Sequence, residues 1–149
     1  MRETRFAGFK RGGSSVIGSL FLAGLMGAGS VAADDLTGAR HLLCSVLEAH
    51  VCVETASCSQ VLPEELNIPL FIRIDAQSGK LSTTPASGEN RETAADSVSR
   101  ADDQLTLQGV ENGRAFSLFI QESTGLATFA SAAAGRSFTV FGACTPLQQ

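Results

Sequence analysis

Residues 105–145 read LTLQGVENGRAFSLFIQESTGLATFASAAAGRSFTVFGACT, and this stretch decides the fold class. Four apolar segments are separated by three short turns that end in glycine, at 111–113, 123–125 and 133–135. Glycine adopts the left-handed backbone conformation of many hairpin loops without the steric cost that other residues incur. The stretch therefore predicts an antiparallel meander joined by three-residue loops.

Apolar and polar residues alternate in these segments, so each predicted strand has a core face and an outer face. We assign to the core face Leu105, Leu107, Gly109, Phe116, Leu118, Ile120, Leu126, Thr128, Ala130, Phe138, Val140, Gly142 and Cys144. The outer face then carries Phe119, Phe129 and Phe141 on three successive strands. These phenylalanines form a partner-binding surface or pack under a second layer of structure. Arg114 and Arg136 follow turns and predict a small basic rim or solvated turn charges.

The residues before the meander extend the same pattern. Leu70, Ile72 and Ile74 begin a further hairpin that turns at Gly79, and Pro63-Glu64-Glu65-Leu66 predicts one helical turn, because proline and acidic residues favour helix starts. We expect an all-β fold of about eight antiparallel strands in an up-and-down meander. Pairing of the first strand with the last would make it a small closed or nearly closed barrel.

Residues 41–53, HLLCSVLEAHVCV, fit a strand and a helix almost equally well. We favour a strand because residues 51–53 are rich in valine and no helix stop signal precedes them. A regular strand would place Cys44 on the same face as Glu48 and His50, which is a poor core face. A bulge or a helical first turn would remove this conflict.

The first 33 residues have the pattern of a signal peptide. A basic start is followed by an uncharged apolar run at 16–26 and by the small residues Val31-Ala32-Ala33, which suit a signal peptidase. The run is shorter than the roughly 20 residues of a membrane-spanning helix, which disfavours the alternative of an uncleaved anchor. We expect a signal peptide at 1–33, a single domain at 34–149, and a periplasmic or secreted protein without stable membrane insertion.

The predicted mature chain is strongly acidic. Removing residues 1–33 takes four of the 11 basic and one of the 15 acidic residues, which leaves a net charge of −7. Nucleic acids and anionic membranes recruit clustered lysine and arginine, so this balance disfavours both as partners. It favours a basic periplasmic or envelope protein as a partner, although solubility alone also explains a negative surface.

All four cysteines lie in the predicted mature chain, and an even number in a small exported domain predicts two disulfides. Three pairings are possible, and we favour Cys44 with Cys144 and Cys52 with Cys58. The first would join the opening segment to the last strand, and a loop of about 100 residues contributes about 4.7 kcal/mol in the chain-entropy model. The alternative of a metal site lacks the closely spaced cysteine pairs of structural zinc sites.

No catalytic, cofactor-binding or metal-binding constellation is recognisable. The two histidines, His41 and His50, match no zinc motif, and no G-x-S-x-G marks a nucleophile. The glycines match neither a phosphate-binding loop nor a dinucleotide fingerprint. Tryptophan and tyrosine, the usual sugar platforms, are absent. We therefore expect a non-enzymatic protein without a cofactor.

Four segments resemble a family of small exported proteobacterial proteins of unknown function: NIPLFIRID at 67–75, LQGVENGRAFS at 107–117, STG at 123–125 and VFGACT at 140–145. The resemblance implies periplasmic residence and a β-rich fold, and it brings no catalytic residues. A looser similarity is to periplasmic lysozyme inhibitors, small disulfide-tied β-barrels with a Ser-Gly loop that enters the lysozyme cleft. Ser87-Gly88 matches that dipeptide, but Glu89-Asn90-Arg91 follow where that family has a tyrosine.

The sequence is therefore compatible with three hypotheses about function. The leading hypothesis is a periplasmic module that binds a protein or an envelope component. The second is an inhibitor of a basic hydrolase such as lysozyme. The third is a barrel that carries a small apolar ligand, because small residues are frequent and open the interior of a barrel.

Overall fold

The computed structural model describes residues 35–87 and 90–147. The predicted signal peptide and Gly88 lie outside these residues. The described residues form ten strands and two short 3₁₀ helices: β1 (His41–Val53), β2 (Ser59–Val61), η1 (Pro63–Leu66), β3 (Phe71–Asp75), β4 (Lys80–Thr83), η2 (Pro85–Ser87), β5 (Glu92–Ala94), β6 (Ser97–Ala101), β7 (Gln104–Glu111), β8 (Arg114–Gln121), β9 (Leu126–Ala133) and β10 (Arg136–Pro146). The all-β prediction is confirmed, and the helical turn lies at 63–66 as expected.

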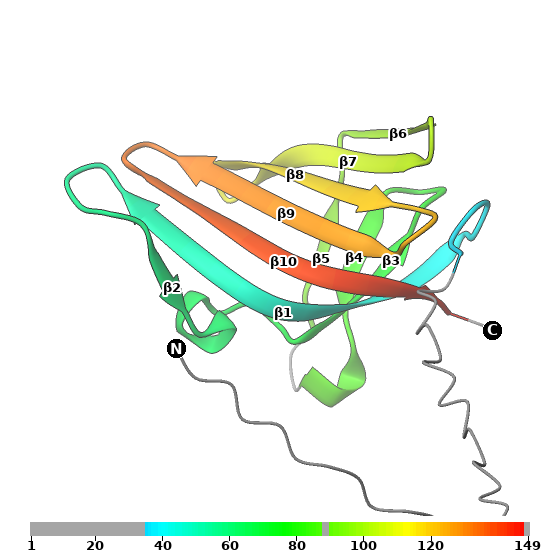
Figure 1. Cartoon of the computed structure of the whole chain (residues 1–149), viewed down its shortest axis with the longest axis horizontal. Coiled ribbons are helices and arrows are strands. Elements are labelled where there is room, and N and C mark those ends of the chain that lie inside the picture. The colour runs from blue at the N-terminus through cyan, green and yellow to red at the C-terminus, as the bar shows by residue number, and fades with distance from the viewer. Residues whose placement is uncertain (1–34, 88–89, 148–149) are drawn as a thin grey trace, which may run out of the picture. The chain divides into compact units, whose positions relative to one another are not determined.

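One antiparallel sheet contains all ten strands, in the order β5-β4-β3-β1-β10-β9-β8-β7-β6, with β2 paired to the second half of β1. Figure 1 shows how this sheet curls, with β1, β10 and β9 side by side and β3, β4 and β5 behind them. The first strand does pair with the last, as predicted. This pairing joins two meanders in the middle of the sheet, because β1 also pairs with β3 on its other side.

The result is a curled half-barrel whose edge strands, β5 and β6, are consecutive in the chain. Only Ala95 and Asp96 separate them. The Ala95 amide donates to the Gly79 carbonyl next to β4, and the Asp96 amide donates to the Gln108 carbonyl on β7. The connection between β5 and β6 therefore links the two sides of the half-barrel without a continuous ladder between them.

A β-bulge in β1 resolves the conflict seen in the sequence. The register against β10 shifts between Val46 and Glu48, which leaves Leu47 as the extra, exposed residue. A bulge moves the following side chains to the opposite face. Cys44 is therefore buried before the bulge and Ala49 is buried after it, whereas Glu48 and His50 remain partly exposed.

The hairpin loops contain two or four residues, and the prediction of three-residue loops is wrong. Glu111 pairs with Arg114 around a two-residue turn, in which Asn112 and Gly113 both have positive φ. Between β8 and β9, Ile120 pairs with Ala127, so each even-numbered residue of β8 faces an odd-numbered residue of β9. The inner residues of β9 are consequently Ala127, Phe129 and Ser131, and the face assigned to this strand from the sequence is reversed.

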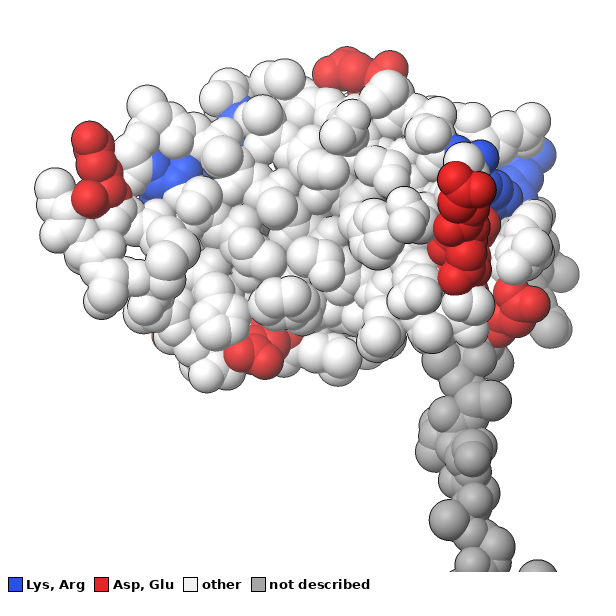
Figure 2. All heavy atoms as spheres, turned by 45° about the horizontal axis from the view of Figure 1, so that its top comes forward, with Lys and Arg blue, Asp and Glu red and all other residues white. Residues whose placement is uncertain are grey.

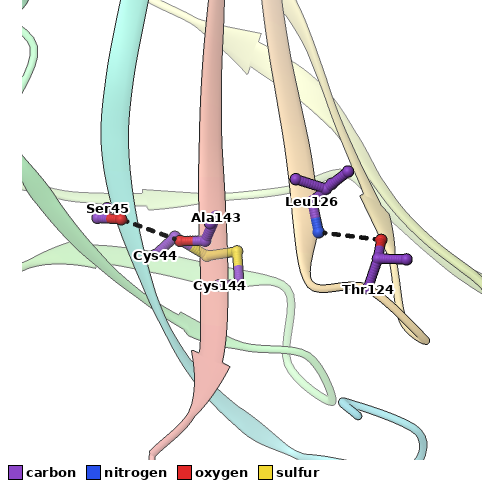
Figure 3. Close-up of a disulfide and its surroundings, with 6 residues drawn as sticks. All are labelled: Cys44, Ser45, Thr124, Leu126, Ala143 and Cys144. Atoms are coloured by element: carbon purple, nitrogen blue, oxygen red, sulfur yellow. Dashed lines mark hydrogen bonds between the residues drawn. A yellow bond between two sulfur atoms is a disulfide. The ribbon is translucent and has the colours of Figure 1, made fainter. Parts of the chain in front are cut away.

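Two disulfides join the described cysteines in the pairing that we favoured, Cys44 with Cys144 and Cys52 with Cys58. Cys44 and Cys144 are register partners in β1 and β10, and both are buried (Figure 3). Beside them, the Ser45 hydroxyl donates to the Ala143 carbonyl. The long-range disulfide therefore fastens the seam where the two meanders meet.

One end of the half-barrel is sealed by the turn before β1. Leu36 is fully buried, and its amide donates to the Glu122 carbonyl. Arg100 Nε lies 2.9 Å from the buried Glu122 carboxylate, and an Arg100 Nη atom donates to the Ala39 carbonyl. This end of the interior is filled by Leu36, Leu42, Leu105, Leu107 and Ile120, all with 0% exposure.

Candidate functional site

A cavity of about 140 Å³ lies inside the sheet, toward the other ends of the same strands. Its wall includes residues of β1, β3, β4, β5, β7, β8, β9 and β10, together with the segment after η1 at 67–69. The strands bring these residues together because inward-facing side chains of a curled sheet converge on its axis.

Three phenylalanines form the aromatic wall of the cavity. The Phe129 ring stacks on Phe116 at a centroid distance of 5.8 Å and on Phe138 at the same distance. These residues come from adjacent strands, with Phe129 on the central strand β9. Leu118 and Val140, the register partners of Phe129 on either side, continue the apolar wall deeper into the sheet.

The position of the Phe116 ring also depends on a nearby glycine. A Cβ atom at Gly109, its register partner on β7, would lie 2.8 Å from the Phe116 ring. That distance is too short for a side chain to be accommodated without movement of the ring. Gly109 therefore provides the space in which Phe116 turns toward the cavity.

The rim of the cavity is polar and charged. Glu111 and Arg114 face each other across the β7–β8 turn, and both line the cavity. The Thr93 hydroxyl on β5 donates to Glu111 Oε1 on β7, and it bridges the two sides of the half-barrel at this end. Arg91 Nη1 donates to the Asn67 carbonyl at 2.7 Å.

Charge is partly balanced around this rim. Glu92 lines the cavity and pairs with Lys80, whose Nζ lies 2.6 Å from its carboxylate. The cavity thus has an aromatic interior, and its entrance carries side chains of both charges. This arrangement can hold an apolar body inside and a polar group at the mouth.

The predicted surface of three outer phenylalanines does not form. Phe129 points inward, and the sequence placed it wrongly because the β8–β9 loop has four residues instead of three. Phe119 and Phe141 are on the outer face, with 38% and 43% exposure, and Thr128 lies between them as the register partner of both. The outer pair is therefore separated by one strand.

The two basic residues predicted at the rim have different surroundings. Arg114 lines the cavity, whereas Arg136, two residues before the lining residue Phe138, is not among the residues that line it. The sequence could have predicted that Arg114 faces the interior, because Arg114 lies two residues before Phe116 and thus on the same face of the strand. Glu111, Thr93 and the inward direction of Phe129 required the strand register, which the sequence did not reveal.

Ser87, predicted as a partner contact, lies in η2, and its hydroxyl donates to the Thr84 carbonyl. Gly88, the other half of that dipeptide, lies outside the described residues. The hypothesis of a hydrolase-inhibiting Ser-Gly loop therefore stays a prediction. Of the two histidines, His50 lies edge-on to Phe141 at 6.1 Å and contacts the Glu48 carboxylate, on the outer face of β1.

Within residues 35–87 and 90–147, no group of three or more histidine, cysteine, aspartate or glutamate side chains is arranged to hold a metal ion. No helix in this part of the chain is long and apolar enough to cross a membrane. The disulfides fit an oxidising compartment outside the cytoplasm. Comparison with family models, curated proteins and solved structures finds no match to this chain.

Proposed function

We propose that this protein is an exported, non-catalytic binding protein that holds a small, largely apolar ligand in the cavity of its curled sheet. The observation that supports the proposal is the aromatic cavity itself. Its wall is built by residues from eight strands, and its entrance carries a few polar groups. Small-molecule sites combine these two features, with apolar walls for affinity and a few polar groups for orientation.

The size of the cavity limits the ligand. An engineered cavity of about 150 Å³ lined by leucine, isoleucine and phenylalanine binds benzene. The present cavity, at about 140 Å³, is of this size and also opens to its rim. We therefore infer a ligand with one ring or a short branched chain inside and the remainder at the mouth.

Export to the periplasm is part of the proposal. The basic start, the apolar run at 16–26 and the small residues before residue 34 suit a cleaved signal peptide. Two disulfides suit the oxidising compartment that such a signal reaches. Cell fractionation with an antibody against the protein tests this part. If the protein is found in the cytoplasmic fraction with residues 1–33 still attached, export is contradicted.

Titration with 4-ethylbenzyl alcohol tests ligand binding, followed by calorimetry and by the methyl resonances of Leu118 and Val140. We expect saturable binding that shifts both resonances. Ser131→Leu should abolish it, because Ser131 is buried in the cavity wall and the larger side chain fills the space. The matched control is Ala130→Leu, because Ala130 is adjacent on β9 and exposed on the outer face. Equal binding by the wild type and Ser131→Leu, with both proteins folded, would contradict the proposal.

A second candidate function is binding of a protein or envelope component through the outer face. Phe119, Phe141 and Leu126 are exposed on adjacent strands of this face. Figure 2 shows one face of the protein on which charged side chains are sparse over the middle. Affinity capture from periplasm with the wild type and with Phe119→Ser/Phe141→Ser tests it. A partner recovered equally by both proteins would contradict a role for these phenylalanines.

A further inference from the structure

We infer that the ligand is a small amphipathic acid, whose carboxylate is bound by Arg114 at the rim while its apolar part occupies the cavity. This inference rests on the proposed function. Arg114 begins β8 at the cavity entrance, on the same face as Phe116 two residues later. A ligand that contacts the aromatic wall therefore extends toward the guanidinium group when it reaches the mouth.

Arg114 is available for a ligand. Among the basic residues that the structure describes, Arg40 pairs with Asp75, Lys80 with Glu92 and Arg100 with Glu122. Arg91 is hydrogen-bonded to the Asn67 carbonyl. Among the described residues, no ion pair or hydrogen bond engages the Arg114 side chain.

Glu111 carries the opposite charge at the same rim, so its interactions must be compared with those of Arg114 to decide whether an anion or a cation is favoured. One of its carboxylate oxygens already accepts the Thr93 hydroxyl, and its side chain is half-buried. Arg114 is exposed, and its planar guanidinium presents two parallel donors that match a carboxylate. The unoccupied donor group therefore selects an anion, and Glu111 weakens that preference by repulsion.

The rest of the rim supports the same sign of charge. Lys80 neutralises the Glu92 carboxylate, and Arg91 adds a second cation to the lining. The lining of the cavity contains two basic residues, Arg91 and Arg114, and two acidic residues, Glu92 and Glu111. Because Lys80 pairs with Glu92, that carboxylate opposes a bound anion less than an unpaired one would.

Three probes with one tail and different heads test the inference: 4-ethylbenzoate, 4-ethylbenzyl alcohol and 4-ethylbenzylamine. Each is titrated calorimetrically into the protein with both disulfides formed. A charged hydrogen bond contributes enough free energy for about a tenfold preference, so the carboxylate should bind about tenfold more tightly than the alcohol. The protonated amine should bind more weakly than both.

Variants then assign the preference to Arg114. Arg114→Gln should weaken carboxylate binding about tenfold and leave alcohol binding within about twofold, because the apolar contacts are retained. Glu111→Gln should strengthen carboxylate binding, because it removes the repulsion and keeps an oxygen acceptor for Thr93. Arg136→Gln is the control for loss of one positive charge outside the cavity, and it should change neither affinity.

The outcomes separate this inference from the proposed function. If the alcohol binds and the carboxylate binds no more tightly, the ligand is not an acid, although the cavity is still a binding site. If the carboxylate is preferred and Arg114→Gln preserves the preference, the assignment to Arg114 is wrong. If none of the three probes binds the folded protein, the proposed function fails and this inference fails with it.

Discussion

Cys44 and Cys144 are 100 positions apart in the chain, yet they are direct register partners on β1 and β10 and form a disulfide (Figure 3). The bond lies at the seam between the meander of β3, β4 and β5 and the meander of β6 to β10. The wall of the cavity is drawn from both meanders. The disulfide therefore constrains the two halves that together form the candidate site.

Removing this disulfide should destabilise the protein much more than removing the short one. In the chain-entropy model the Cys44→Ala/Cys144→Ala protein loses about 4–5 kcal/mol of unfolding free energy, because the closed loop is long. Cys52→Ala/Cys58→Ala should lose about 2 kcal/mol, since the separation is only six residues. Urea unfolding of both double variants measures the difference, and equal losses would show that loop length does not govern their contributions.

Phe129 should behave as a core residue and Phe119 as a surface residue. Phe129→Ala removes a ring that stacks on two neighbours, and we expect a loss of about 2–3 kcal/mol, below the value for a fully buried phenylalanine. Phe119→Ala on the outer face should cost less than about 1 kcal/mol. Urea unfolding compares the two. If the Phe129→Ala protein is as stable as the wild type, the inward packing of Phe129 is contradicted.

Asp75 should make stability depend on pH. Burial opposes ionisation of its carboxyl group, but hydrogen bonds from the amides of Gln77 and Ser78 and from Arg40 outweigh this effect and hold the pKa well below its usual value of 3.8. A depressed pKa in the folded state stabilises the protein above pH 3.8, and this contribution is lost as the pH falls below that value.

Asp75→Asn tests this dependence, because asparagine retains the oxygen acceptor for the turn but carries no charge. The wild type should be more stable than Asp75→Asn at pH 7, and the difference should shrink as the pH is lowered through 4 toward 2. Urea midpoints over this range measure the effect. A difference that is constant with pH would exclude ionisation of Asp75 as its source.

The ion pair at the sealed end should also contribute to stability. Arg100→Met leaves the Glu122 carboxylate, which is 5% exposed, without its partner. We expect a loss of about 1–3 kcal/mol, less than for a fully buried pair because a third of the Arg100 side chain is exposed. Arg100→Met/Glu122→Met should recover part of the loss, since an apolar pair leaves no buried charge. A double variant less stable than Arg100→Met would contradict this explanation.

The sequence by itself determined the strands and the class of fold. Alternation over 114–121 and 136–146 assigned Phe116, Leu118 and Val140 to the inner face, and the structure confirms these assignments. Local preferences suffice here, because side chains of one strand alternate with a fixed period of two whatever the partner strand. The conflict around Cys44 predicted either a bulge or a helical first turn, and the structure has the bulge.

Only the tertiary structure decided which residues meet across strands. Phe129 faces inward because the β8–β9 loop contains four residues, and a change of one residue in a loop reverses the whole following strand. The central position of the β1–β10 pair, and hence the open edges at β5 and β6, depends on β3 pairing with β1. The cavity and its rim of Glu111, Thr93 and Arg114 are set by register and curl, which depend on non-local hydrogen bonds that no local pattern encodes.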